Sequence, residues 1–166
     1  MIDVLSDAWI VSALAGLVGL MIGSFLNVCT LRWPEDESVV FPGSHCPKCG
    51  EAIRWHDNVP VFGYLLLGGR CRACRDPISL QYLLVELATG LVWAGMFSYA
   101  GLSFEALRGA LLLTILFGIA LTDARFYIIP DQFSLGGLVL GLGLAFLPGG
   151  IDALDALIGA IVGFGL

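Results

Sequence analysis

Long apolar runs separated by short polar stretches dominate this chain of 166 residues. Residues 8–31 hold no charge, and a helix of about 20 residues is enough to cross the hydrocarbon core of a membrane. Further apolar runs cover residues 81–100, 105–122 and 133–147, and another begins at residue 151. The pattern predicts an all-α polytopic membrane protein with about five transmembrane helices, the last of them incomplete.

The first run could instead be a cleaved signal peptide, which would need a basic N-terminal region and a shorter apolar core. Here the N-terminus carries Asp3 and Asp7, and the positive residue Arg32 follows the run. We therefore predict a retained helix whose C-terminal end lies in the cytoplasm, because cytoplasmic loops are rich in Lys and Arg.

Residues 32–80 interrupt the apolar pattern with a polar segment. Charged residues make up only 13% of the chain, yet six of its eight basic residues lie between Arg32 and Arg75. Recurrent prolines and glycines exclude a long helix, so we expect short strands or turns at most. At about 50 residues the segment is too small to bury much core and needs a staple.

The charges also orient the helices. With residues 32–80 in the cytoplasm, the next two helices run outward and back, so the polar turn at 123–132 lies on the same face. Arg125 agrees with this orientation and Arg108 disagrees, but the overall bias of basic residues decides it. The net charge of −6 counts against a nucleic-acid partner, which would need a basic surface.

Two CxxC motifs in the polar segment predict a metal site. They are Cys46-Pro-Lys-Cys49 and Cys71-Arg-Ala-Cys74, with 21 residues between them. Two such turns facing each other supply four thiolates to a tetrahedral zinc ion, which is then structural because no position stays open for water. A pair of disulfides is the less favoured alternative, since cytoplasmic thiols stay reduced.

Other residues around the cysteines have subordinate roles in this interpretation. Four cations are placed to offset the surplus negative charge of the thiolates: Lys48, Arg70, Arg72 and Arg75. His45 could replace a ligand, but four cysteines suffice. Cys29 is expected to be a small buried residue of the first helix.

Three carboxylates lie near the predicted ends of the spans. Glu86 lies about one and a half turns into the second span, where it either faces the protein interior or reaches back to the interface. Asp131 opens the fourth helix and is expected to cap its free N–H groups. Asp123 closes the third helix, where the negative end of the helix dipole disfavours a carboxylate. That misfit makes Asp123 the candidate for acid–base chemistry.

Several motifs in a fixed order carry a family resemblance. They are GSFLNVCTLRWP (23–34), the paired CxxC loop, NVPVFGYLLLGGRCRACRDPIS (58–79), YLLVELATG (82–90) and TDARFYIIPD (122–131). Together they resemble the type IV prepilin leader peptidase/N-methyltransferase family over nearly the whole chain. The resemblance implies a multi-pass aspartyl protease of the bacterial inner membrane, which cleaves prepilins or pseudopilins after a glycine at the cytoplasmic face. It also implies N-methylation of the new N-terminal residue with S-adenosylmethionine.

The resemblance also assigns roles to individual residues. Asp123 matches the first catalytic aspartate, Asp131 the aspartate of the (I/L)PD motif, and Glu86 a recurring glutamate. The four cysteines match the zinc loop of the family. We accordingly divide the chain into a first transmembrane helix (1–31), a cytoplasmic zinc-binding loop domain associated with methyl transfer (32–80), and the N-terminal part of the membrane peptidase domain (81–166).

The sequence departs from the family in one respect. The second catalytic aspartate of the family lies in a downstream GxGD motif, which this sequence does not contain. An aspartyl protease needs two carboxylates that share a proton, and Asp131 is the less favoured partner for Asp123. We therefore expect an N-terminal portion of a longer enzyme that has no peptidase activity by itself. The alternative is a non-catalytic membrane protein whose zinc loop docks a cytoplasmic assembly partner.

Overall fold

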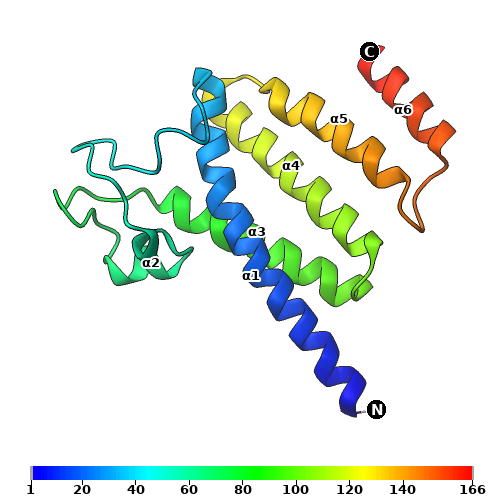
Figure 1. The fold of residues 1–166 in the computed structure, drawn as a ribbon, viewed down its shortest axis with the longest axis horizontal. Coiled ribbons are helices and arrows are strands. Elements are labelled where there is room, and N and C mark those ends of the chain that lie inside the picture. Colours follow the sequence, from blue (N-terminus) through cyan, green and yellow to red (C-terminus); the bar gives the residue numbers. More distant parts are fainter. Residues whose placement is uncertain (1, 166) are drawn as a thin grey trace.

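The computed structural model describes residues 2–165, and within them it contains helices, turns and two isolated β-bridges but no strand (Figure 1). The α-helices are α1 (Ile2–Arg32), α2 (Phe62–Leu66), α3 (Leu80–Ala100), α4 (Phe104–Phe126), α5 (Asp131–Ala145) and α6 (Ala153–Gly165). Two short 3₁₀ helices, η1 (Trp33–Glu35) and η2 (Trp55–Asn58), lie in the polar segment. The helices α1, α3 and α4 are long and apolar enough to cross a membrane, and α5 and α6 are shorter apolar helices. The predicted all-α membrane architecture is confirmed.

The long helices begin and end at identifiable caps. Ser79 and Ser103 precede α3 and α4, and each hydroxyl accepts a hydrogen bond from a free N–H of the first turn. The end of α4 lies four residues beyond the predicted residue 122. There Tyr127 adopts a left-handed conformation, and its N–H donates to the Asp123 carbonyl at 2.9 Å. Asp123 therefore lies within the last turn of α4 and does not close it.

Close backbone contact joins α1 to α3. A Cβ atom built at Gly19 would lie 2.7 Å from the Cβ of Trp93, and one at Gly23 would lie 2.8 Å from the Cα of Glu86. Only glycine permits this approach, which is how small residues promote helix packing in membranes. The indole N–H of Trp93 then donates to the Thr114 hydroxyl at 3.0 Å, which ties α3 to α4.

Arg108 near the start of α4 has a structural partner. Its guanidinium donates to the carbonyls of Leu144, Leu147 and Pro148 at 3.2, 2.6 and 3.0 Å. These carbonyls lie at and beyond the C-terminal end of α5, where backbone acceptors have no partner within the helix. This role accounts for the one basic residue that disagrees with the predicted orientation.

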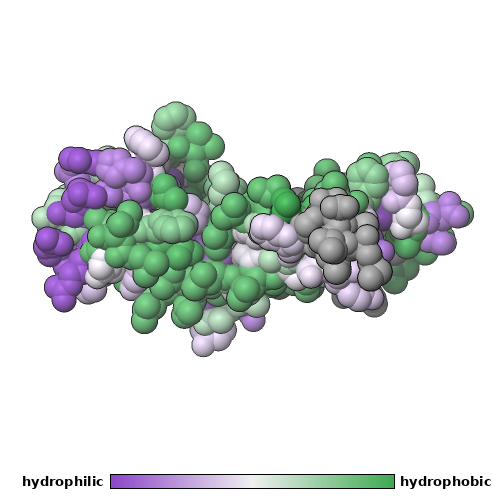
Figure 2. Space-filling view, turned by 90° about the horizontal axis from the view of Figure 1, so that it is seen from below, coloured by the Kyte–Doolittle hydropathy of each residue, from purple (hydrophilic) through white to green (hydrophobic). Residues whose placement is uncertain are grey.

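The polar segment lies at one side of the helices in Figure 1, and hydrophilic residues gather mainly at that end of the molecule in Figure 2. The prediction that no long helix crosses residues 32–80 is confirmed. The expectation of short strands or turns at most is wrong in one respect, because α2 forms a helix of five residues. Its apolar sequence FGYLL carries no polar pattern that would mark a helix by periodicity.

Candidate functional site

The four cysteines of the CxxC motifs converge on one point. Their sulfur atoms all lie within 4.8 Å of one another, with Cys46 to Cys74 at 3.8 Å and Cys49 to Cys71 at 4.0 Å. Four sulfurs at about 2.3 Å from a tetrahedral zinc ion would be about 3.8 Å apart. All four are free thiols, and their separations are far beyond the length of a disulfide bond. The cluster therefore fits a metal ion such as zinc.

The two CxxC turns share a hydrogen bond, a left-handed residue and a closing bridge. In the first, the Gly50 N–H donates to the Cys46 carbonyl at 2.9 Å, and in the second the Arg75 N–H donates to the Cys71 carbonyl at 3.1 Å. Both residues that follow the motifs are left-handed, with φ of 72° at Gly50 and 62° at Arg75. A short bridge closes each turn: His45 pairs with Ala52, and Arg70 pairs with Pro77. The loop is thus built from two similar halves that face each other.

In the second turn, backbone N–H groups favour the thiolate form of Cys71. Hydrogen bonds from the N–H groups of Cys74 and Ala73 lower the pKa of Cys71 to about 7. At Cys74 the N–H of Asp76 lowers the pKa, but desolvation and the neighbouring sulfurs outweigh it and raise the pKa to about 12. Four thiols in contact cannot all ionise alone, so binding of a metal would release protons from the cluster.

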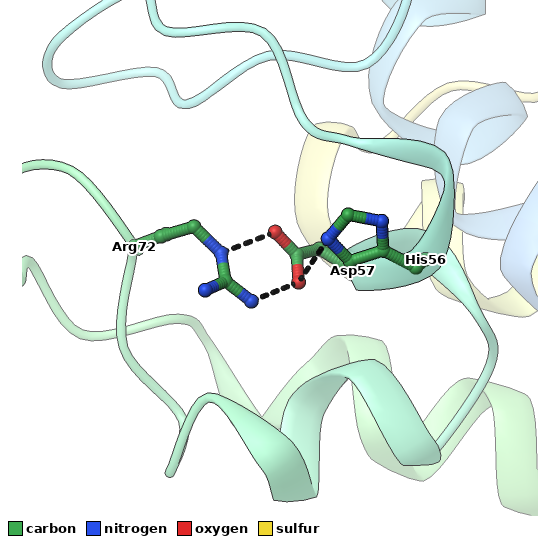
Figure 3. A network of polar contacts seen from close by, with 3 residues as sticks. All are labelled: His56, Asp57 and Arg72. Carbon is green, nitrogen blue, oxygen red and sulfur yellow. Dashed lines mark hydrogen bonds and ion pairs between the residues drawn. The ribbon is translucent and has the colours of Figure 1, made fainter.

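A bidentate ion pair connects the second turn to η2 (Figure 3). The Nε and Nη2 atoms of Arg72 donate to the Asp57 carboxylate at 2.7 and 2.6 Å, and His56 Nε2 lies 3.7 Å from the same group. The Asp57 side chain is only 7% exposed. The hydrogen bonds and charge of Arg72 lower the pKa of Asp57 and hold it ionised. Arg72, predicted to offset the thiolate charge, is thus engaged by a carboxylate.

A second contact joins the loop to α3. The Glu86 side chain is buried, and its Oε2 accepts a hydrogen bond from the Val61 N–H at 2.7 Å. Val61 has φ 64° and ψ −53°, and the Phe62 N–H donates to the Pro60 carbonyl at 2.7 Å. This is a strained γ-turn, which is rare for a β-branched residue. Of the two readings of Glu86, the structure supports the one in which it faces the interior.

The remaining candidate carboxylates lie at the two sides of the α4–α5 linker. Asp123 is exposed on the last turn of α4, and Asp131 is the exposed first residue of α5. The expected cap by Asp131 is wrong: Pro130 occupies the N-cap position, and α5 has no side-chain cap. Asp131 still lies at the positive end of the helix dipole. Asp131 also lines a groove of about 570 Å³ between α5 and α6.

The α4–α5 linker and the polar segment lie at the same end of the bundle. The ring of Phe133 on α5 packs edge-on against Trp33 at the end of α1, with their centroids 4.7 Å apart. Figure 1 shows the linker passing beside the C-terminal end of α1. In the described chain, Asp123 and Asp131 are not joined by a hydrogen bond.

Sequence reasoning missed the two contacts that position the loop. Asp57 lies outside the quoted motifs, and Val61 lies inside the motif at 58–79 but was given no role; their partners Arg72 and Glu86 are 15 and 25 residues away. Cys29 is buried in α1, as expected. The His45 ring lies 3.0 Å from the Gly43 carbonyl and is a residue of the loop, also as expected.

Comparison with known proteins yields two family matches. Residues 17–100 match the bacterial peptidase A24 N-terminal domain, and residues 110–166 match the type IV leader peptidase family. Three similar proteins, each named prepilin leader peptidase/N-methyltransferase, come from Myxococcus xanthus, Klebsiella pneumoniae and Neisseria gonorrhoeae. They are 43, 39 and 34% identical over 89, 89 and 91% of this chain.

The chain covers only part of these relatives. It spans 44, 68 and 61% of the length of the three proteins, in the same order. No solved structure matches the chain.

Proposed function

Because the chain belongs to the type IV leader peptidase family, we propose that it carries the metal-binding loop and one catalytic carboxylate of a membrane aspartyl protease. Its substrates are prepilins or pseudopilins, which are cleaved after a glycine of the leader. The reaction takes place at the cytoplasmic face of the bacterial inner membrane. The concentration of Lys and Arg in the polar segment supports this orientation.

One observation carries the proposal most directly, namely the position of Asp123. Its carboxylate is exposed on the last turn of an apolar helix, at the end of the bundle that also carries the loop. A leader peptide that leaves the membrane at this end would reach it without crossing the bilayer. In the reaction one carboxylate takes a proton from the attacking water while the other donates one to the leaving amine. We assign one of these two roles to Asp123.

The second carboxylate is assigned to the GxGD motif that the family resemblance implies, and not to Asp131. Asp131 lines the groove between α5 and α6. It also occupies a favourable structural position at the start of α5. The two aspartates therefore have different surroundings, which supports different roles.

The metal in this proposal is structural. Four thiolates fill a tetrahedral zinc ion and leave no position for a reacting water. The ion would hold together the two halves of the polar segment at residues 32–80, which we treat as one loop domain between the first helix (1–31) and the membrane region (81–166). Cys46, Cys49, Cys71 and Cys74 are the ligands.

N-methylation of the cleaved product is proposed for the intact enzyme because its relatives are named prepilin leader peptidase/N-methyltransferase. A groove of about 300 Å³ lies between α1 and the loop, where S-adenosylmethionine would have to find polar partners. Its polar lining consists of Ser24, Arg32, Ser44 and Asn58. The Arg32 guanidinium already donates to backbone carbonyls of residues 38–43, and this lining includes no carboxylate for ribose hydroxyls or an amine. This groove therefore does not fit the cofactor.

The experiment compares three aspartate variants of the intact natural chain in a prepilin cleavage assay. Asp123→Asn should lower cleavage by at least about 100-fold, because removal of an acid–base group typically costs that much. Asp155→Asn, at an exposed position in the first turn of α6, is the matched control and should cleave normally. Asp131→Asn should retain activity. Undiminished cleavage by Asp123→Asn would refute the role of Asp123, and loss in Asp131→Asn would make Asp131 its partner.

A further inference from the structure

The short helix α2 has its apolar face turned outward. Phe62, Leu65 and Leu66 lie at spacings of three and four residues, which places them on one side of the helix. Their exposed fractions are 58, 62 and 80%. The opposite side is packed, because a Cβ atom at Gly63 would collide with the Asp57 carbonyl. Three large apolar side chains that lie exposed together on a polar loop indicate a surface that contacts an apolar partner.

The contact with Glu86 fixes the level of α2 along the bundle. The Val61 N–H, directly before α2, bonds the Glu86 carboxylate at 2.7 Å. Glu86 lies six residues after Leu80, the first residue of α3, which corresponds to about 9 Å along a helix. The start of α2 therefore lies beside the first turns of a membrane span and not beyond its end.

The packing of α1 gives an independent measure of the same level. Gly23 contacts the Cα of Glu86, and it lies nine residues before Arg32, the last residue of α1. This corresponds to about 14 Å along α1. Even if α1 is tilted, Glu86 lies closer to the centre of the membrane than Arg32, the basic residue that marks the end of the span. In Figure 1, α2 lies alongside the helices, while the two cysteine turns extend away from them.

We propose that α2 is an interfacial membrane anchor of the loop domain. Phe62, Leu65 and Leu66 insert between lipid chains at the boundary of the headgroups and the hydrocarbon core, beside α3. Exposed Trp55 on the adjoining η2 belongs to the residue type that prefers this boundary, and exposed Arg54 can pair with lipid phosphates. The cysteine cluster remains in water.

Lipid is the favoured occupant because of the level of α2. A cytoplasmic partner protein would meet the outer, polar end of the loop, whereas the outward face of α2 lies beside an apolar span. A burial depth of about 5–10 Å is typical of helices that lie in the interface. The proposal does not depend on the catalytic role of Asp123, so cleavage assays and the following experiment fail independently.

The test is site-specific photo-crosslinking of the intact chain in its native membrane. A benzophenone amino acid replaces Leu66, and the adducts are identified by mass spectrometry. We expect lipid adducts at position 66, as at Leu91, an exposed apolar position of α3 that serves as the positive control. The same probe at Glu51, an exposed residue of the first cysteine turn, should give no lipid adduct.

A second variant separates insertion from mere proximity. The changes Phe62→Asn and Leu65→Asn remove apolar surface that is already exposed, so the metal content of the loop should stay unchanged while the lipid adducts at position 66 decline. Adducts only with protein at position 66, or the same lack of adducts as at position 51, would overturn the proposal. Unchanged lipid adducts in the double variant would also overturn it.

Discussion

Gly50 and Arg75 occupy equivalent positions after the two CxxC motifs, yet only one of them is a glycine. Both have a left-handed backbone and donate an N–H to the first cysteine of their own turn. A residue with a Cβ atom loses about 1 kcal/mol or more in this conformation, whereas glycine adopts it freely. The second turn therefore carries strain that the first one lacks.

This comparison predicts opposite responses to substitution. Gly50→Ala should destabilise the loop by about 1 kcal/mol, which speeds the transfer of zinc to a chelator. Arg75→Gly should have little effect or slow the transfer, because the relieved strain is offset by the greater freedom of the unfolded chain. Gly43→Ala, with open space around it and no positive φ, is the control and should match the wild type. Equal rates for Gly50→Ala and the control would contradict the strain argument.

At the scale of single residues, motifs were predictable and long-range partners were not. The spacing of the cysteines was enough to predict that four thiols meet, since each CxxC turn brings two sulfurs to one side. Asp131 was predicted to be the N-cap because it precedes an apolar run. In the structure Pro130 is the N-cap, and Asp131 is already the first residue of α5. Asp57 and Val61 gain their roles only from partners that the fold brings to them.

At the scale of elements, glycines decide how the membrane helices meet. Gly19 on α1 lies against the Trp93 Cβ and the Gly90 Cα of α3, with 2.7 and 2.9 Å left for a Cβ atom. Contacts below 3.0 Å oblige the backbones to separate, so a single methyl group here acts on the whole α1–α3 interface.

We predict that Gly19→Ala lowers the stability of the membrane region by about 1–3 kcal/mol, the usual cost of overpacking. Gly95→Ala is the matched control, because Gly95 lies on α3 with nothing within 4 Å of a Cβ atom. It should be neutral or slightly stabilising, since alanine favours the helix. Thermal unfolding in detergent measures both. Equal loss in both variants would contradict the contact argument, because a Cβ atom at Gly95 meets no neighbour.

The elements themselves were largely predictable, because apolar runs long enough to cross a membrane have few alternatives to a helix. The ends were less predictable. The α4 helix continues through Asp123, Ala124 and Arg125, where a drop in hydropathy suggested a turn. Hydrogen bonding and not polarity ends this helix, at the left-handed Tyr127. The short α2 escaped detection because its exposed apolar face resembles a buried one in sequence.

At the scale of the whole molecule, two polar contacts connect the cysteine cluster to the membrane helices. Arg72 of the second turn binds Asp57 of η2, and the same segment continues to the γ-turn at Val61. Glu86 holds that turn, and its helix packs against Gly23 of α1. The loop is thus attached at a buried point as well as by its two covalent ends, and removing Glu86 should uncouple it.

The last prediction tests this attachment by replacing the acceptor in two ways. Glu86→Ala leaves the Val61 N–H without its partner and lets the strained γ-turn relax, so the local free energy of opening should fall by about 1–3 kcal/mol. Glu86→Gln keeps an acceptor oxygen and should retain much of the protection. Hydrogen exchange over residues 57–67 measures the opening.

Glu105→Ala, which replaces an exposed glutamate in the first turn of α4, is the control. Metal content should stay constant in all three variants, since the thiols lie outside the contact. If exchange in Glu86→Ala matches that of the wild type and of Glu105→Ala, the Glu86 carboxylate is not the attachment point of the loop.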